Sequence, residues 1–331
     1  MACTCSPSRV DGSHAGDHGG RNAFLRGHVD VDGRCHDGAV HNTVGVSLFP
    51  HHLAHSEFGL HPFGNGFLRG RGMMTEAFWI PEGNELFRAT IHTQGPWNPQ
   101  FQHGGPPAAL LVRQLEACSP REDMVLARVS IDILAPVPIA TLTALAHVLR
   151  PGRSVELLEA SLEHEGRLIM RATGWQVRLP NVRPPADEPD LPPGLPEGRA
   201  TPTIASFVNS GFFSATEWRT VRENNERGQA TAWARLRYPL IVGETISPIQ
   251  HLIAVADYAN GLSWRLDIRS WQFVPPELTL HILRPPIGEW ICLDAVTDLQ
   301  SEGVGLTTAH LFDQQGQVAR SAQSLFIARR A

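Results

Sequence analysis

The chain has 331 residues, 42% of them hydrophobic, which is long enough for two ordinary domains or one large one. Its formal net charge of −5 at pH 7 leaves no basic footprint, so we expect no nucleic-acid partner. No apolar run approaches the length that spans a bilayer, so we expect a soluble protein without a membrane span. All 28 basic residues are arginine, which excludes lysine-based catalysis.

The five cysteines are scattered along the chain rather than grouped. Their spacing matches neither a disulfide framework nor a zinc module, so a reducing cytoplasm is the simplest compartment and we expect no metal site. The first residues also lack the continuous apolar segment and cleavage pattern of a secretory signal. The cysteines are Cys3, Cys5, Cys35, Cys118 and Cys292.

Residues 1–74 differ in composition from the rest of the chain. Nine of the sixteen histidines and many glycines lie here, without a sustained period of 2 or 3.6. A metal-binding tract is one interpretation, but the spacings match no zinc module, so disorder is the default. A second interpretation is that the natural chain begins at Met73 or Met74, and that residues 1–72 do not belong to it.

We expect a first folded domain at 75–178. A turn-rich loop, Gly95–Gly105, precedes a helix with proline in its first turn, and several strands rich in Val, Ile, Leu and Thr follow. One helix followed by an antiparallel run of strands indicates the α+β class. The expected elements are the strand Leu86–His92, the helix Pro106–Ala117, and the strands Leu126–Leu134, Ala140–Arg150, Val155–Glu163 and Arg167–Arg178.

The chain is divided by residues 179–200, which are rich in proline and acidic residues, the composition of an extended linker. The part after the linker repeats the part before it. Ile133–Pro136 matches Ile282–Pro285, and Arg171–Thr173 matches Arg320–Ala322 at the same offset. We infer a duplicated unit, whose two sheets would join edge to edge and so remove exposed edges.

The second domain is expected at 201–331 and has the same order of strand, helix and antiparallel strands. A short stretch, Arg219–Glu223, has no regular pattern. The expected elements are the strand Gln229–Tyr238, the helix Ser247–Asn260, and the strands Trp271–Val274, Leu278–Leu283, Trp290–Leu299, Gly305–Phe312 and Gln317–Ala328.

One acidic residue, Asp257, lies within the otherwise apolar second helix. Ser247 can cap the start of this helix, Pro248 suits its first turn, and Gly261 can end it. An ionised carboxylate in apolar surroundings is costly unless it is hydrogen-bonded. The position therefore indicates either a functional carboxylate or an aspartate at a helix end that simply reaches water.

Five motifs in order resemble the acyl-CoA thioesterase II-like family of the hotdog superfamily, in its double-hotdog form. The resemblance covers Glu76 to Arg330 and implies an α+β fold of two tandem units, each with a long helix packed on an antiparallel sheet. The motifs are His103-Gly104-Gly105 before the first helix, Ile-Leu-x-Pro in both halves, ADYANG (Ala256–Gly261), LRPPIGEW (Leu283–Trp290) and GQVARSAQSLF (Gly316–Phe326).

The resemblance implies hydrolysis of a fatty acyl-CoA thioester to acid and free CoA, in fatty acid metabolism, with no cofactor besides the CoA of the substrate. An Asp, a Thr and a Gln position the water in that family. The Asp falls at Asp257 and the Gln at Gln323, but the place of the Thr falls at or beside Pro275. Thr279 is the nearest replacement, and we discount it because strand geometry moves it roughly 13 Å along.

Further candidate residues surround this pair. Gly104 and Gly105 can offer backbone N–H groups to an oxyanion, although a tight loop-to-helix turn explains them equally well. His103 and Asn260 are candidates for substrate binding. Arg150 and Arg153 can bind CoA phosphates because arginine matches phosphate geometry, although an exposed turn with solvated charges is the simpler interpretation.

We expect one reaction centre per chain, because the only carboxylate of the first helix is Glu116 at its C-terminal end. Two alternatives stay open. The loss of the Thr leaves open a module that binds acyl-CoA without hydrolysing it. An enoyl-CoA hydratase would need a His five residues after the Asp, where this chain has Leu262. Since hotdog sheets often join, a homo-oligomer is a reasonable expectation.

Overall fold

The computed structural model describes residues 76–182, 184–185, 187–188, 190–198, 200–204 and 211–330. The expectations for residues 1–74 lie outside this part of the chain. No helix among the described residues combines the length and the apolar character that are needed to cross a membrane. We call residues 76–178 the first half and residues 211–330 the second half.

The first half follows the expected order of elements, with two differences. The strand expected at Leu86–His92 ends at Ala89, because Thr90 caps a short 3-10 turn by accepting a hydrogen bond from the His92 N–H. An additional strand precedes it. The elements are β1 (Trp79–Gly83), β2 (Leu86–Ala89), η1 (Ile91–Thr93), α1 (Gly105–Cys118), β3 (Met124–Ile133), β4 (Thr141–Arg150), β5 (Val155–His164) and β6 (Arg167–Arg178).

The second half corrects two expectations. The stretch Arg219–Glu223 falls largely in a strand, and the helix expected to reach Asn260 ends at Ala256, with Asp257 as its C-cap. The elements are α3 (Gly211–Ser214), β7 (Thr216–Arg222), β8 (Gln229–Leu236), α4 (Pro248–Ala256), α5 (Ala259–Leu262), β9 (Trp271–Val274), β10 (Glu277–Ile282), β11 (Ile291–Leu299), β12 (Val304–Asp313) and β13 (Gly316–Arg329).

The thirteen strands of the described residues form one sheet with a mirrored order of strands. At its centre β3 pairs antiparallel with β10, in a register that places Ser130 opposite Thr279. Outward from this junction the order is β3, β6, β5, β4, β2, β1 on one side and β10, β13, β12, β11, β8, β7 on the other. The short strand β9 lies off this path and pairs with β13. The two halves thus share one topology and one continuous sheet.

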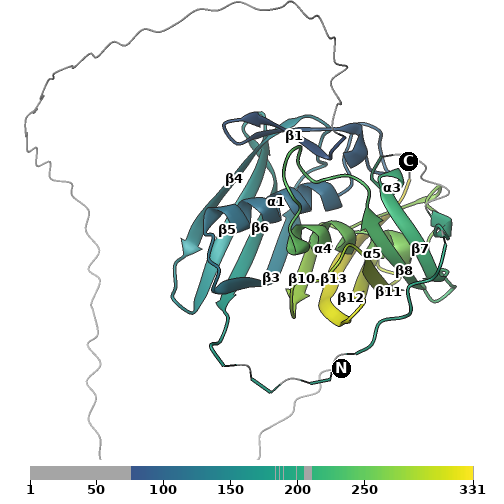
Figure 1. Ribbon diagram of the computed structural model, residues 1–331. Coiled ribbons are helices and arrows are strands. Elements are labelled where there is room, and N and C mark those ends of the chain that lie inside the picture. The colour runs from purple at the N-terminus through teal and green to yellow at the C-terminus, as the bar shows by residue number, and fades with distance from the viewer. Residues whose placement is uncertain are drawn as a thin grey trace, which may run out of the picture. The chain divides into compact units, whose positions relative to one another are not determined.

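Helices α1 and α4 lie on the same face of the sheet and contact each other (Figure 1). They run antiparallel, because Gly105 at the start of α1 packs against the Ala254 carbonyl near the end of α4. Both helices form because their apolar residues recur at helical spacing, so that these side chains are buried between each helix and the sheet. The fully buried side chains include Leu110, Leu111, Val112 and Leu115 of α1, and Leu252, Ile253 and Val255 of α4.

The opposite ends of these helices meet through polar groups. Ser247 caps α4, and its hydroxyl donates to the Glu116 carboxylate of α1 at 2.8 Å, while Gln250 Nε2 donates to the same group at 2.7 Å. Burial raises the pKa of the Glu116 carboxyl, and the hydrogen bonds from Ser247 and Gln250 offset this rise in part. This carboxylate therefore joins the helices.

The segment expected as an extended linker contains no helix or strand over its described residues. It nevertheless packs on the second half. The indole of Trp233 donates to the Pro193 carbonyl at 3.1 Å, and Arg219 donates to the Pro196 carbonyl at 3.0 Å. Leu195 packs on a cluster that contains Trp233 and Trp290. The linker thus contributes to the packing of the second half.

Candidate active site

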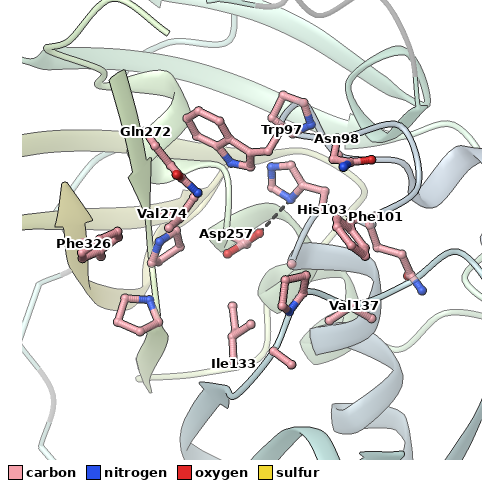
Figure 2. Close-up of a pocket in the computed structure, with 18 of the residues that line it drawn as sticks. Trp97, Asn98, Phe101, His103, Ile133, Val137, Asp257, Gln272, Val274 and Phe326 are labelled. Carbon is pink, nitrogen blue, oxygen red and sulfur yellow. Dashed lines mark ion pairs between the residues drawn. The ribbon is translucent and has the colours of Figure 1, made fainter. Parts of the chain in front are cut away.

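A cavity of about 610 Å³ is lined by residues of both halves of the chain, and we refer to it as the cavity. Its walls come from the loop at 95–104, the residues that follow β3, the end of α4 with α5, and the segment from β9 to Pro276. Most of the lining is apolar, with Val137 and Val274 on opposite sides (Figure 2). The polar groups gather where Asp257 and His103 meet.

Asp257 is held by one residue from each half. Only 4% of its surface is exposed. Its Oδ1 atom accepts a hydrogen bond from Gln323 Nε2 at 3.2 Å, and its Oδ2 atom lies 2.7 Å from His103 Nδ1. Figure 2 shows the His103 ring and the Asp257 carboxylate in direct contact at the wall of the cavity. The structure thus brings three predicted residues together, although Gln323 lies behind Asp257 and does not line the cavity.

The ring nitrogen Nδ1 of His103 has two neighbours but only one bonding position. It lies 2.7 Å from the Asp257 carboxylate and 3.3 Å from the Gly105 N–H. The shorter contact involves a charged acceptor, and such hydrogen bonds are the stronger ones, so we assign the proton to Nδ1 and the donation to Asp257. In the neutral ring, Nε2 is then a free acceptor on the side away from Asp257.

An aromatic cluster holds the His103 ring in this orientation. Its centroid lies 5.0 Å from that of Phe212 and 4.8 Å from that of Tyr258, and these two rings are stacked. The Tyr258 hydroxyl donates to the Phe212 carbonyl at 2.7 Å. Burial, with a smaller contribution from Asp257, raises the pKa of Tyr258 well above its ordinary value of 10, so this donor stays protonated. The cluster leaves the imidazole little freedom to turn.

Gly104 and Gly105 have different roles. Gly104 lines the cavity, and a Cβ atom added there would lie 2.8 Å from Asp257 Oδ2, so only glycine lets this backbone meet the carboxylate. Its N–H has no hydrogen-bond partner among the described residues. Gly105 is buried and does not line the cavity. Of the two glycines, only Gly104 can therefore offer its N–H to a ligand in the cavity, whereas Gly105 packs against Ala254 and Phe212.

The two helix termini next to Asp257 have opposite effects on its negative charge. Asp257 follows the C-terminal end of α4, where the partial negative charge of the helix disfavours a carboxylate. It also adjoins the start of α1, where Gly104 is the N-cap and the positive end of the helix dipole favours one, although Pro106 and Pro107 carry no N–H. The favourable effect at the start of α1 thus offsets the unfavourable effect at the end of α4. Asn260 also lines the cavity and donates to the Phe273 carbonyl at 3.4 Å.

Pro275 lines the same cavity as Asp257, so the position where the resemblance expects a threonine borders the cavity but carries no hydroxyl. Thr279 does not replace it. This residue does not line the cavity, and its hydroxyl donates to Ser130 at 3.2 Å across the junction of β3 and β10. Among the described residues, the Asp257 carboxylate has one donor in Gln323 and a second one in His103.

Two family models match the chain in succession. The one described as the acyl-CoA thioesterase N-terminal domain matches residues 93–177, and the one described as the acyl-CoA thioesterase C-terminal domain matches residues 183–327. The chain belongs to the acyl-CoA thioesterase family. This confirms the resemblance that the motifs indicated, over both halves of this family member. No curated protein matched its sequence.

Solved structures similar to this family member cover about three quarters of its length. One is a protein provisionally assigned as a thioesterase II from Thermobifida fusca YX (TM-score 0.59, 20% identity, covering 76% of this chain and 95% of that one). A second is a conserved protein of unknown function with a hot dog fold from Alicyclobacillus acidocaldarius (0.57, 16%, 75% and 95%). A third is the acyl-CoA thioesterase II TesB2 from Mycobacterium marinum (0.53, 17%, 76% and 95%). At these identities the likeness establishes the hotdog fold alone.

The prediction that Arg150 and Arg153 bind CoA at this site is not supported by their position. Neither lines the cavity, which adjoins the start of α1. Arg121, three residues beyond the end of α1, donates to the Gly152 carbonyl at 3.1 Å, so the turn that carries both arginines lies at the other end of the helix. A helix of 14 residues spans roughly 20 Å.

The first half of this thioesterase-family protein carries no counterpart of the pair formed by Asp257 and Gln323. The strand pairs Ser130 to Thr173 and Thr279 to Ala322 correspond, so Gly174 occupies the place of Gln323. A Cβ atom at Gly174 would lie 3.0 Å from Leu115, whose apolar side chain packs on the strand there. The geometry favours one reaction centre per chain, which stays a prediction.

Sequence reasoning did not predict the contact between His103 and Asp257 in this family member, although it selected both residues. It also missed Trp97, which lines the cavity within the turn-rich loop. The available signal was the concentration of aromatic and polar residues in that loop. Among the described residues no group of three or more His, Cys, Asp or Glu side chains is arranged to hold a metal ion.

Proposed function

We propose that this protein hydrolyses an acyl-CoA thioester to a free acid and CoA. Membership of the acyl-CoA thioesterase family supports this reaction class. The observation that carries the proposal is the buried carboxylate of Asp257, fixed by an imidazole and an amide where it borders a largely apolar cavity, beside the free N–H of Gly104.

The proposed reaction begins with a water molecule that donates a hydrogen bond to Asp257. The water oxygen attacks the carbonyl carbon of the thioester, and the Asp257 carboxylate takes its proton. The carbonyl oxygen becomes negatively charged and is stabilised by the Gly104 N–H and the positive end of α1. The carbon–sulfur bond then breaks, and the proton passes from Asp257 to the CoA thiolate.

His103 and Gln323 are positioning residues in this proposal. A carboxylate has about four lone-pair positions, so donors from His103 and Gln323 leave room for a water molecule. Together they prevent Asp257 from turning away from the cavity. The resemblance expected a threonine to share in positioning the water, and Pro275 cannot do so. The donor that His103 supplies to the Asp257 carboxylate would compensate in part for this loss.

For the architecture, we propose two tandem hotdog units, at 75–178 and 201–331, joined by the linker at 179–200. The mirrored strand order on either side of the junction between β3 and β10 supports this division. So do the contacts of α1 with β4, β5 and β6, and of α4 with β8 and β11. The reaction centre then lies between the units, with Asp257 from one and Gly104 from the other.

The proposal is tested by thiol release from a panel of acyl-CoA substrates with the wild type and Asp257→Asn. We expect the wild type to release thiol and the variant to lose about 100-fold or more in kcat, because asparagine cannot take the proton. Asp298→Asn, which neutralises an exposed carboxylate on β11, is the matched control and should keep full activity. Equal turnover by wild type and Asp257→Asn contradicts the proposal.

A second function is supported by Pro275, which removes a hydroxyl from the site. A module that binds acyl-CoA without hydrolysing it would tolerate this change. Binding of acyl-CoA by the wild type without any thiol release favours the module, and release that depends on Asp257 favours the enzyme.

A further inference from the structure

Arg330 does not itself line the cavity but stacks on Trp97, which does. Its guanidinium carbon is 5.1 Å from the ring centroid of Trp97, which lines the cavity and packs edge-to-face on Phe273 at 5.1 Å. Trp97 is half-buried and Arg330 is exposed, so this pair marks the boundary between the cavity and solvent. The backbone N–H of Arg330 donates to the Ser270 carbonyl at 3.0 Å, which fixes where the side chain begins.

The stacking leaves the charge of Arg330 available. A guanidinium that stacks on an aromatic ring uses its flat face, while its N–H donors point outward in the plane. No carboxylate pairs with Arg330 among the described residues. The ring restricts the side chain, so less conformational freedom is lost when the donors bind a ligand. An exposed, preorganised fork of donors is suited to phosphate.

The substrate class supplies such a ligand, and this step rests on the proposed function. When the thioester lies against Asp257, the pantetheine arm must follow the apolar wall of the cavity outward, and the phosphate groups of CoA emerge at its rim. Arg150 and Arg153 lie at the far end of α1. We propose that Arg330, stacked on Trp97, binds the phosphate groups of CoA.

The chain offers a matched control in the neighbouring residue. The guanidinium of Arg329 also stacks on an indole, that of Trp271 at 4.6 Å, but Trp271 does not line the cavity. Arg329 carries the same charge, is equally exposed and precedes Arg330 directly. The two guanidinium groups stack on different indoles, so the two side chains differ mainly in whether they pack on a residue that lines the cavity.

The test compares the full-length wild type, Arg330→Gln and Arg329→Gln on two thioesters with the same acyl group, acyl-CoA and acyl-pantetheine. We expect Arg330→Gln to lower kcat/KM for acyl-CoA by about 10-fold through KM, because a charge-assisted hydrogen bond is lost. Its kcat/KM for acyl-pantetheine, which lacks the nucleotide phosphates, should not change. Arg329→Gln should resemble the wild type on both substrates.

Three results would overturn the proposal. They are a kcat/KM of Arg330→Gln for acyl-CoA equal to that of the wild type, an equal loss of its kcat/KM on both thioesters, or an equal loss of kcat/KM for acyl-CoA in Arg329→Gln. If the wild type hydrolyses neither thioester, the proposed function fails but the binding site is still tested. Titration of the wild type with CoA and with pantetheine, followed by tryptophan fluorescence, then decides. About 10-fold weaker CoA binding by Arg330→Gln alone supports the site, and no CoA binding by the wild type overturns it.

Discussion

The Nδ1 atom of His103 lies 2.7 Å from the Oδ2 atom of Asp257, so a loop of the first half and a helix end of the second half share one buried contact. The contact forms because α1 and α4 run antiparallel, which brings the start of one helix to the end of the other. The following predictions concern the residues that depend on this arrangement.

We predict that His103→Phe lowers kcat for acyl-CoA hydrolysis by about 10-fold to 100-fold, because phenylalanine fits the aromatic cluster but donates no hydrogen bond to Asp257. His103→Asn should retain more activity, since its amide can donate near the position of Nδ1. Steady-state kinetics of both variants check this. Equal activity of the two variants would show that the donor is unimportant.

We predict that Gln323→Leu lowers kcat by about 10-fold and the free energy of unfolding by about 1–3 kcal/mol, because Asp257 loses a buried donor. Gln317→Leu, at another buried glutamine of β13, is the control and should leave kcat unchanged. Kinetics and urea denaturation measure the two effects. A normal kcat for Gln323→Leu would remove this residue from the site.

We predict that Gly104→Ala lowers kcat/KM by about 10-fold or more, because the added methyl group displaces the Asp257 carboxylate. The backbone there has φ −66°, which alanine adopts readily, so any loss in the free energy of unfolding should come from the displaced carboxylate and not from backbone strain. Gly194→Ala, whose added methyl group meets no atom within 4 Å, is the control. An active Gly104→Ala contradicts the close approach of backbone and carboxylate.

We predict that Pro275→Thr raises kcat severalfold by placing a hydroxyl on the wall of the cavity that Asp257 also lines. The loss of proline should lower the free energy of unfolding by about 0.4–1 kcal/mol, so activity is compared well below the melting temperature. Pro276→Thr, at the neighbouring cavity residue, should bring no gain. If neither variant is faster than the wild type, a hydroxyl at this position does not limit turnover.

We predict that the free energy of unfolding of Glu116→Gln, relative to the wild type, increases as the pH rises. Burial raises the pKa of Glu116 in the folded state above 4.5. The contribution of Glu116 to the free energy of unfolding is therefore fully present below pH 4.5 and is lost as the pH rises through the folded-state pKa. Glutamine has no such dependence. Urea denaturation at about pH 4 and pH 7 measures the difference. A constant difference would contradict the raised pKa.

Local patterns in the sequence predicted most elements of the fold. The strands from Leu126 to Arg178 and from Trp271 to Ala328 agree with the structure to within one or two residues, because alternating apolar residues and turn signals act over short distances. The acidic residue in an apolar helix identified Asp257 for the same reason. The helix end was missed, because apolar residues continue past Asp257 although α4 ends at Ala256.

The partners of Asp257 were decided by tertiary structure. Resemblance selected Gln323 and His103, but no local pattern states that both reach the same carboxylate, since this depends on how α1 docks on α4 and how β10 pairs with β3. The arginines show the same limit of sequence-based prediction. The turn that contains Arg150 has residues suited to binding phosphate but lies at the far end of α1, whereas Arg330 stacks on Trp97 of the cavity. Sequence determines which groups a segment carries, but distances between segments arise only when helices and strands pack together.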